Sequence, residues 1–288
     1  MTEAEERPAR VMPAVLAFVA LALLSVSCMP NRPIDIGDLA DQLAAIRPTA
    51  VIHTGDAVIA SGDINGDSDG HFVMCLGLSQ LATSGRECRL SVSLVNLKPS
   101  EVPGWVEEAG TRIASDVTVH GHWGADGIVV EHASPGIVGQ EDVPYPANPC
   151  PHLAGLDADQ RTVEVEGAAR KLWEAVTGAP GVYGGVWNAG SQGQSVAVVA
   201  TVGDPLEARS KLKPLYDFPV CFVHVARSAA DLQRLASSVQ ALDPSWTTIV
   251  EAPVNRLRVV LPVVDVATWS ELEVFADQIV ASPLVRPK

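Results

Sequence analysis

A single apolar run near the start of the chain constrains where the protein folds more than any other sequence feature. The run extends from Val11 to Val26 and follows two arginines, Arg7 and Arg10. As a helix, such a run would rise about 24 Å, which is less than the hydrocarbon thickness of about 30 Å. Arginines directly before an apolar segment of this length are typical of a signal peptide rather than a spanning helix, although Glu3, Glu5 and Glu6 dilute the positive charge of the leader. The sequence therefore predicts export, and a fold that forms in an oxidising compartment.

Small residues lead from the apolar run directly to a cysteine. The segment Leu24-Ser25-Val26-Ser27-Cys28 resembles a bacterial lipoprotein signal, in which the cysteine is lipidated and becomes the first residue of the mature protein. The resemblance implies that residues 1–28 act as signal and anchor, with Cys28 carrying the lipid. The protein is then expected at the extracytoplasmic face of the cell membrane. Simple secretion, an uncleaved anchor and a buried helix of a cytosolic protein are the alternatives.

Four more cysteines follow, an even number that suits two disulfide bonds after export. Cys75 and Cys88 flank a short polar segment between two apolar runs, as in a stapled hairpin. Cys150 lies in a proline-rich stretch and Cys221 in an apolar run, so a bond between them would fix that stretch to the C-terminal part. Three pairings are possible in principle, and four unpaired thiols are the alternative. CxxC spacing is absent from the sequence, which does not support a zinc ribbon or a thioredoxin-type site.

The charge of the chain argues against one class of partner. The 288 residues carry a formal net charge of −14, and the sequence lacks the Lys and Arg clusters that bind phosphate. We therefore expect no nucleic acid partner, and no basic patch that would attract anionic lipid headgroups. Hydrophobic residues form 47% of the chain against 19% charged residues, which is enough to fill a core and argues against bulk disorder.

The residues after the leader divide into regions of different periodicity. Short alternating or apolar runs, separated by Gly, Asp, Asn and Pro, predict a disulfide-stapled β-rich domain over residues 35–133. Residues 134–158 contain five prolines and predict a linker. Residues 159–288 alternate helical and strand patterns and predict an α+β domain. The predicted fold class is α+β, a small antiparallel β barrel or sandwich followed by an α/β sandwich domain.

The individual elements are predicted from their periodicity. An amphipathic helix is predicted over Asp35–Ile46, ahead of the β-rich region. Ser228-Ala229-Ala230-Asp231 resembles a capping box at the start of a later helix. Strands of the β-rich region are predicted at 50–53, 57–60, 71–77, 89–94, 116–123 and 127–132. In the second region, helices are predicted at 161–176, 206–215, 228–242 and 268–280, and strands at 181–188, 195–202, 219–226, 247–252 and 256–264.

A pair of histidines on one predicted strand offers a candidate transition-metal site. His120 and His122 alternate, so both side chains should point to the same face of the strand. Across the hairpin we expect Glu131 near them, and His132 on the opposite face from Glu131. Imidazole and carboxylate ligands suit a transition metal, and such a site would support a metal-dependent hydrolase. An exposed polar sheet face explains the same residues without a metal.

Alternating oxygen ligands occur in an acidic turn of the β-rich region. Asn65, Asp67 and Asp69 alternate ahead of Gly70, which is similar to the first half of a calcium-binding loop. The twelfth position of the loop is Leu76, where a bidentate glutamate is needed. A calcium-stabilised turn is therefore one interpretation, and an acidic solvated hairpin tip is the other.

Several segments of the β-rich region resemble a group of known proteins. Val73–Leu76 with Cys88, and Val117–Trp123 leading into Gly127–Val130, are similar to segments of uncharacterised exported proteins and lipoproteins of actinobacteria. The resemblance implies an exported protein, and it implies no particular activity.

The C-terminal part has a resemblance of its own. Gly184–Trp187, Val196–Val202, Ser228–Val239 and Pro253–Val260 are similar to the pro-regions of secreted serine proteases of the α-lytic type. In those pro-regions, such strands and helices build small α/β units that help the protease to fold. The resemblance implies a scaffold similar to a folding or inhibitory module.

These features predict a non-enzymatic extracytoplasmic lipoprotein that binds another protein or an envelope component. The membrane is reached through the N-terminal anchor, and no cofactor is expected. One alternative is a secreted metal-dependent hydrolase that uses His120, His122 and Glu131. The other is a calcium-stabilised binding module that uses Asp67 and Asp69.

Overall fold

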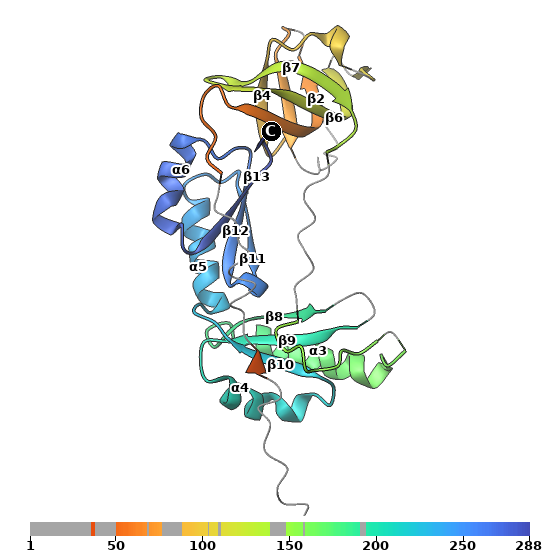
Figure 1. The fold of residues 1–288 in the computed structure, drawn as a ribbon, viewed down its shortest axis with the longest axis vertical. Coiled ribbons are helices and arrows are strands. Elements are labelled where there is room, and N and C mark those ends of the chain that lie inside the picture. Colours follow the sequence, from red (N-terminus) through yellow and green to blue (C-terminus); the bar gives the residue numbers. More distant parts are fainter. Residues whose placement is uncertain are drawn as a thin grey trace, which may run out of the picture. The chain divides into compact units, whose positions relative to one another are not determined.

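A computed structural model of the protein describes residues 36–37, 50–67, 69–76, 88–102, 104–108, 111–138, 148–157, 159–190 and 194–288. The leader 1–28, including Cys28, lies outside the described residues, as does most of the helix predicted over Asp35–Ile46. Residues Asp35–Lys288 form one compact unit. This unit is mixed α+β, with three sheets and four α-helices in its described part (Figure 1). The predicted α+β class is thus confirmed at this coarse level.

The first sheet contains seven strands in the order β14-β2-β3-β4-β7-β6-β5, and β2 pairs with β6 as well. Its strands are β2 (Ala57–Gly66), β3 (Phe72–Leu76), β4 (Ser91–Val95), β5 (Val106–Glu108), β6 (Thr111–Gly124), β7 (Gly127–Pro135) and β14 (Arg286–Pro287). The described pairs are antiparallel except for β4–β7, a parallel pair that the antiparallel prediction did not include. Because β2 pairs along both edges, the pairings run from β2 through β3, β4, β7 and β6 back to β2.

Alternation in the sequence explains the central position of β2. Val58, Ala60 and Ile64 are buried, while the residues between them are exposed or partly exposed. Gly62 and Gly66 take the other inward positions, and a Cβ on Gly62 would lie 2.1 Å from the carbonyl oxygen of Cys75. Gly62 therefore allows β3 to pair closely with β2, beside the apolar core of the first sheet.

The second sheet has the order β1-β10-β9-β8 and is covered by helices on one face. Its strands are β1 (Ile36–Gly37), β8 (Tyr183–Ala189), β9 (Val196–Thr201) and β10 (Val220–His224), and its helices are α3 (Val163–Thr177) and α4 (Pro205–Leu212). Both helices contribute to one apolar cluster with the sheet, which includes Leu172, Leu212 and Phe222. A second cluster contains Cys150 and Cys221 and buries the other set of side chains of β8, β9 and β10.

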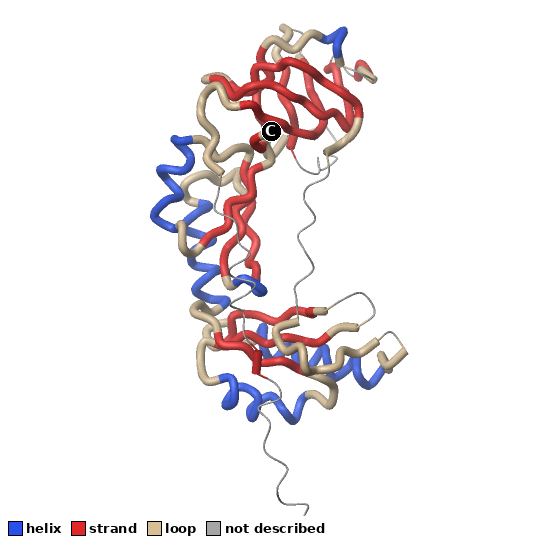
Figure 2. Tube along the Cα trace, viewed as in Figure 1, coloured by secondary structure: helices blue, strands red, loops and turns tan. Residues whose placement is uncertain are grey.

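The third sheet has the order β11-β12-β13 and repeats the plan of the second. Its elements are α5 (Ala229–Gln240), β11 (Thr247–Glu251), β12 (Arg256–Leu261), α6 (Val266–Leu272) and β13 (Ile279–Pro283). The succession of helix, hairpin, helix and parallel strand is the same as in α3-β8-β9-α4-β10 (labelled in Figure 1; helices are blue and strands red in Figure 2). The second helix of each unit starts at an aspartate cap, Asp204 in one and Asp265 in the other. The region 159–288, predicted as one α+β domain, thus contains two units of one design. We call α3-β8-β9-α4-β10 the second unit and α5-β11-β12-α6-β13 the third unit.

Two predictions of secondary structure in these units are wrong. The sequence predicts one helix over 268–280, but α6 starts at the Asp265 cap and is followed by β13. The strand forms because Ile279 and Ala281 pack in the apolar cluster of the third sheet. Ile36–Gly37, predicted to lie in the first turn of a helix, pairs in parallel with β10 instead. In both places tertiary packing or pairing overrides a helical pattern.

The last described residues return to the first sheet. The N–H of Val285 donates to the carbonyl of Pro262 at 2.8 Å, and the Val285 side chain is fully buried in the core of the first sheet. Strand β14 then pairs antiparallel with β2. On the N-terminal side, the N–H of Ile52 donates to the carbonyl of Val264 at 2.7 Å. Backbone hydrogen bonds therefore join the first sheet to the third unit at two points.

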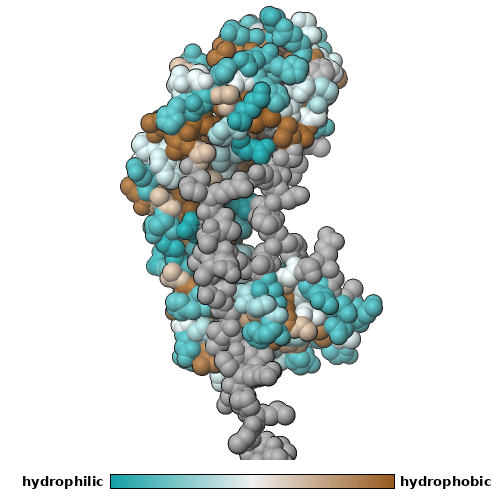
Figure 3. All heavy atoms as spheres, viewed as in Figure 1, coloured by the Kyte–Doolittle hydropathy of each residue, from teal (hydrophilic) through white to brown (hydrophobic). Residues whose placement is uncertain are grey.

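Both ends of the predicted linker 134–158 belong to folded structure. Residues 134–135 complete β7, and Val138 N–H donates to Ser61 Oγ at 3.1 Å. Residues 139–147 lie outside the described part, and Cys150 is fully buried against the second sheet. On the face drawn in Figure 3, hydrophilic side chains cover most of the described surface and hydrophobic ones form small patches. This distribution is as expected where the large apolar side chains fill the clusters of the sheets.

Candidate functional site

The four cysteines that follow the leader form two disulfide bonds. Cys75 is bonded to Cys88, with Cα atoms 5.1 Å apart, and Cys150 is bonded to Cys221, with Cα atoms 6.0 Å apart. Of the three pairings that the sequence leaves open, this one staples the β3–β4 hairpin and ties the proline-rich stretch to β10. The predicted disulfide bonds are confirmed.

Asn65, predicted as a calcium ligand, is engaged at the first disulfide. Its Nδ2 donates to Cys75 Sγ at 3.2 Å and lies 3.5 Å from Cys88 Sγ. Asn65 belongs to β2, and β3 pairs with β2 at this position. The side-chain amide of Asn65 therefore contacts the Cys75–Cys88 disulfide, while Asp67 and Asp69 contribute to a turn beyond the end of the strand.

That turn, at the tip of the β2–β3 hairpin, is compact and acidic. Asp67 Oδ1 accepts hydrogen bonds from the N–H groups of Asp69 and His71 at 2.9 and 2.8 Å, and Oδ2 lies 2.9 Å from His71 Nδ1. The backbone hydrogen bond from His71 is the main cause of a lowered pKa for Asp67, and the side-chain bond to Asp67 raises the pKa of His71. Both carboxylate oxygens of Asp67 are thus used by the turn itself.

Asp67, Asp69 and His71 also satisfy a distance criterion for a metal. Within the described ranges, they are the only group of three or more His, Cys, Asp or Glu residues whose ligand atoms lie within 4.8 Å of one another. All three are exposed. A cation bound here would have to displace the imidazole of His71 from Asp67, because the ring already occupies Oδ2.

The β6–β7 hairpin brings two of the three predicted transition-metal ligands together and separates the third from them. His122 Nε2 lies 2.8 Å from Glu131 Oε1, and His122 Nδ1 lies 3.0 Å from the carbonyl oxygen of Gly55. Both ring nitrogens of His122 therefore have protein partners. His120 stacks on His132 instead, with ring centroids 6.1 Å apart and planes at 27°. The structure joins His122 to Glu131 and places His120 beside a histidine that the predicted metal set did not include.

A β-bulge explains this division. His120 pairs with His132, and Gly121 pairs with the residue before Glu131, so Glu131 is the extra residue of β7. The prediction that Glu131 and His132 lie on opposite faces is wrong here. The bulge brings Glu131 to His122 while His132 stays opposite His120. Gly121 is the residue in the sequence that indicates the bulge, because a Cβ at this position would lie 2.1 Å from a carbonyl oxygen of β7.

Residues that carry the resemblance to protease pro-regions meet between the second and third units. Asn255, at a φ of 49°, accepts a hydrogen bond from Arg227 N–H at 2.8 Å and donates one to Arg227 C=O at 2.7 Å. Gly184 permits this approach, because a Cβ on it would lie 3.0 Å from the Arg227 carbonyl oxygen and 3.2 Å from Asn255 Nδ2. Gly185 lies against Ala252, whose Cβ would be 2.7 Å away from an added Cβ. These glycines and Asn255 thus have a structural role.

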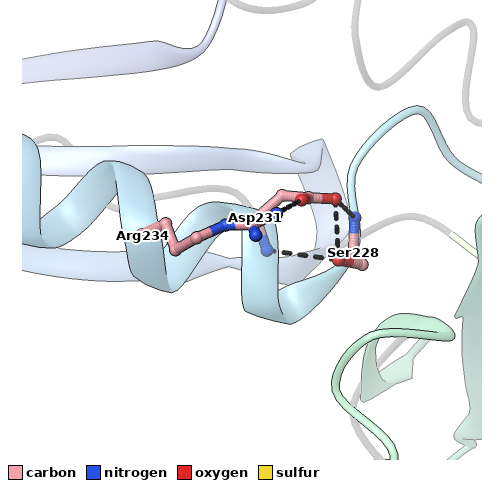
Figure 4. A network of polar contacts seen from close by, with 3 residues as sticks. All are labelled: Ser228, Asp231 and Arg234. Atoms are coloured by element: carbon pink, nitrogen blue, oxygen red, sulfur yellow. Dashed lines mark hydrogen bonds and ion pairs between the residues drawn. The ribbon is translucent and has the colours of Figure 1, made fainter.

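Helix α5 starts next to this contact with a capping box. Ser228 Oγ accepts from the N–H of Asp231 at 3.1 Å, and Asp231 Oδ2 accepts from the N–H and hydroxyl of Ser228 at 3.0 and 2.7 Å (Figure 4). The predicted capping box is confirmed. Arg234 pairs with the other carboxylate oxygen of Asp231. The hydrogen bonds from Ser228, and to a smaller extent the pairing with Arg234, lower the pKa of Asp231.

A groove of about 480 Å³ lies where the first sheet meets the third unit. Trp123 at the end of β6 lines it from the first sheet. Trp246, Asp243 and Glu271 line it from the third unit, and the other lining residues are small, apolar or hydroxyl-bearing. Sequence reasoning missed this groove, because its residues come from segments far apart in the chain and no local pattern marks them.

Comparison with protein families, curated proteins and solved structures gives no match to this chain. The two resemblances stated from the sequence therefore stay predictions. In the part of the chain that the structure describes, no helix is both long and apolar enough to span a membrane.

Proposed function

We propose that this protein is a membrane-anchored lipoprotein of the extracytoplasmic face, and that it binds another protein or an envelope component without catalysing a reaction. Cys28 carries the lipid in this proposal, and the folded unit stands outside the membrane. The formal net charge of −14 argues against a nucleic acid partner, because phosphate groups would be repelled.

The observation that carries the proposal is the pairing of the cysteines. Disulfide bonds form and persist in oxidising compartments and are rare in the cytosol. The pairs Cys75–Cys88 and Cys150–Cys221 use four of the five cysteines of the chain. Export accounts for both bonds, and the fifth cysteine, Cys28, is the one that follows the apolar leader.

The proposal includes a finer architecture. Residues 50–133, together with β14, form a disulfide-stapled β domain, a small barrel or sandwich, and residues 159–288 form the α+β part. The pairing of β2 along both of its edges supports a sheet that curls back toward itself. The proline-rich stretch is the connection between the two parts, and the Cys150–Cys221 disulfide ties its C-terminal end to β10.

The alternatives require a metal, and the geometry favours neither of them. A hydrolase would need His122 as a metal ligand, but both of its ring nitrogens already contact Glu131 and Gly55. Calcium would have to compete with His71 for the carboxylate of Asp67. Metal analysis of the purified protein distinguishes the three functions. Stoichiometric zinc would support the hydrolase, and stoichiometric calcium would support the calcium-stabilised binding module. A protein that contains neither zinc nor calcium would support our proposal.

The main test is an intact mass of the protein from the membrane fraction of its host, before and after reduction and alkylation. We expect a mass that begins at Cys28 with added diacylglycerol, and uptake of four alkyl groups only after reduction. A Cys28→Ser variant is the matched control and should carry no diacylglycerol. A full-length chain without lipid, whose five thiols are all alkylated without reduction, contradicts the proposal.

A further inference from the structure

The groove between the first sheet and the third unit has walls that are fixed by the fold. Trp246 is 5% exposed and belongs to the apolar cluster of the third sheet. Trp123 packs on the core of the first sheet, and its backbone N–H donates to the carbonyl of Asp56 at 2.9 Å. The hydrogen bonds of Ile52 and Val285 hold the two walls together. A groove held in this way is largely formed before a ligand arrives, as most binding sites are.

The charge in the groove has one sign. Asp243 and Glu271 are the charged residues among those that line it, and both are acidic. Asp243 Oδ1 accepts a hydrogen bond from the N–H of Ser245 at 2.8 Å, which fixes that carboxylate at the rim. Glu271 is an exposed residue of α6 and has no ion-pair partner among the described residues. The groove is therefore negative, with no cation of its own to neutralise it.

Two tryptophans beside two carboxylates define the chemistry of a fitting ligand. An indole ring attracts a cation through its quadrupole, and arginine is found on such rings more often than lysine. A guanidinium is planar and weakly hydrated, so it can stack on an indole while its N–H groups reach carboxylates. A volume of about 480 Å³ is enough for one such side chain with some flanking backbone.

We propose that this groove binds an arginine side chain displayed by a protein partner. The inference rests on the proposed function, because a protein partner is what supplies the arginine. It assigns Trp123 and Trp246 to the cation, with Asp243 and Glu271 supplying the opposite charge. Anionic partners are repelled by the same two carboxylates.

The test uses the full chain and a short peptide, acetyl-Gly-Arg-Gly-amide, with the citrulline peptide as its uncharged isostere. Binding is followed by NMR on the indole N–H signals of the six tryptophans. We expect the arginine peptide to shift the signals of Trp123 and Trp246 and to leave those of Trp105 and Trp173 unchanged. The citrulline peptide should bind at least about tenfold more weakly, since it lacks the charge that both carboxylates attract.

Two variants make the test specific. Glu271→Gln should weaken the arginine peptide about threefold to fivefold, because one exposed charge pair is lost. Glu273→Gln is the matched control, since Glu273 lies in the next turn and does not line the groove. Both positions are exposed, so both variants should fold as the original chain does.

Several outcomes would overturn the inference. These are equal binding of the citrulline peptide, tighter binding of an acidic peptide (acetyl-Gly-Glu-Gly-amide), equal effects of the two variants, or no shift at Trp123 and Trp246. If the mass of the chain shows the lipid and both disulfides, any of these outcomes contradicts the assignment of the groove but does not contradict the proposed function. A chain without lipid and with free thiols removes the proposed function, whatever the peptide does.

Discussion

The side-chain amide of Asn255 forms hydrogen bonds with both the N–H and the C=O of Arg227. Asn255 is 4% exposed, so the two backbone groups of Arg227 have little access to water at this point. A buried backbone group that loses its partner costs about 1–3 kcal/mol. One side chain thus stabilises the contact between the connection that leads into α5 and the turn before β12.

Replacing Asn255 should therefore destabilise the protein strongly. We expect Asn255→Ala to lower the free energy of unfolding by about 2–4 kcal/mol, because two hydrogen bonds are lost and a positive φ is kept. Asn96→Ala is the matched control, since Asn96 has a similar φ of 60° but an exposed side chain. It should cost only about 1 kcal/mol from backbone strain. Equal losses in urea unfolding would show that the contact with Arg227 contributes nothing.

The capping box of α5 predicts a smaller effect. Ser228→Ala removes the side-chain acceptor for the Asp231 N–H and should lower the free energy of unfolding by about 1 kcal/mol. Ser237→Ala is the control on the same helix, because the Ser237 hydroxyl is exposed and bonds only to the carbonyl of Gln233. That variant should be close to neutral. A Ser228→Ala variant as stable as Ser237→Ala would contradict a role for the cap.

The ion pair at the tip of the β2–β3 hairpin predicts a dependence on pH. The raised pKa of His71 means that the pair stabilises fully below the ordinary value of 6.5 and is lost as pH rises through the folded-state pKa. The lowered pKa of Asp67 means that its contribution is present above 3.8 and is lost as pH falls through the folded-state pKa. The pair is therefore complete between these two ordinary values.

NMR titration of the His71 ring checks this prediction. In Asp67→Asn the pKa of His71 should be lower than in the original chain, because the hydrogen bond to a carboxylate is gone. Asp126→Asn, at the tip of another hairpin, should leave the His71 titration as it is. Coincident curves for the original chain and Asp67→Asn would exclude the pair in solution.

The two disulfides should differ in their contribution to stability. Cys75 and Cys88 are 13 residues apart, and Cys150 and Cys221 are 71 apart. Loop entropy predicts stabilisation of about 3 kcal/mol for the first and about 4.5 kcal/mol for the second. In urea unfolding, the double alanine variant of the second pair should therefore lose about 1.5 kcal/mol more than that of the first. The opposite order would mean that loop length does not govern these bonds.

Much of the fold can be predicted from local periodicity, and what cannot be predicted depends on distant contacts. Strands β3, β4, β8 and β9 lie within a few residues of their predicted ranges, because one face of each strand is apolar over its length. The helix predicted over 268–280 runs into the first two residues of β13, Ile279 and Val280, because only packing in the third sheet distinguishes them from the end of a helix. Strands β5 and β14 have two or three residues, too few to show a period.

The candidate sites follow the same rule. The disulfides could be expected from export and an even number of cysteines, but only the fold selects one of three pairings. His122 and Glu131 do meet as predicted, whereas the stacking of His120 on His132 depends on a bulge that alternation does not reveal. The groove could not be predicted, since Trp123 and Trp246 become neighbours only when the third unit joins the first sheet.

The pairing of β14 with β2 has a consequence for how the chain is made. Val58 and Ile59 are synthesised early, yet their partners Pro287 and Arg286 come more than two hundred residues later. A chain that is synthesised from its N-terminus must therefore leave one sheet edge unpaired until those residues have been made. Contacts of such long range are also the slowest to form. A chain cut short before Val285 would leave a core position unfilled and part of the β2 edge unpaired, and an unpaired strand edge is a site where chains aggregate.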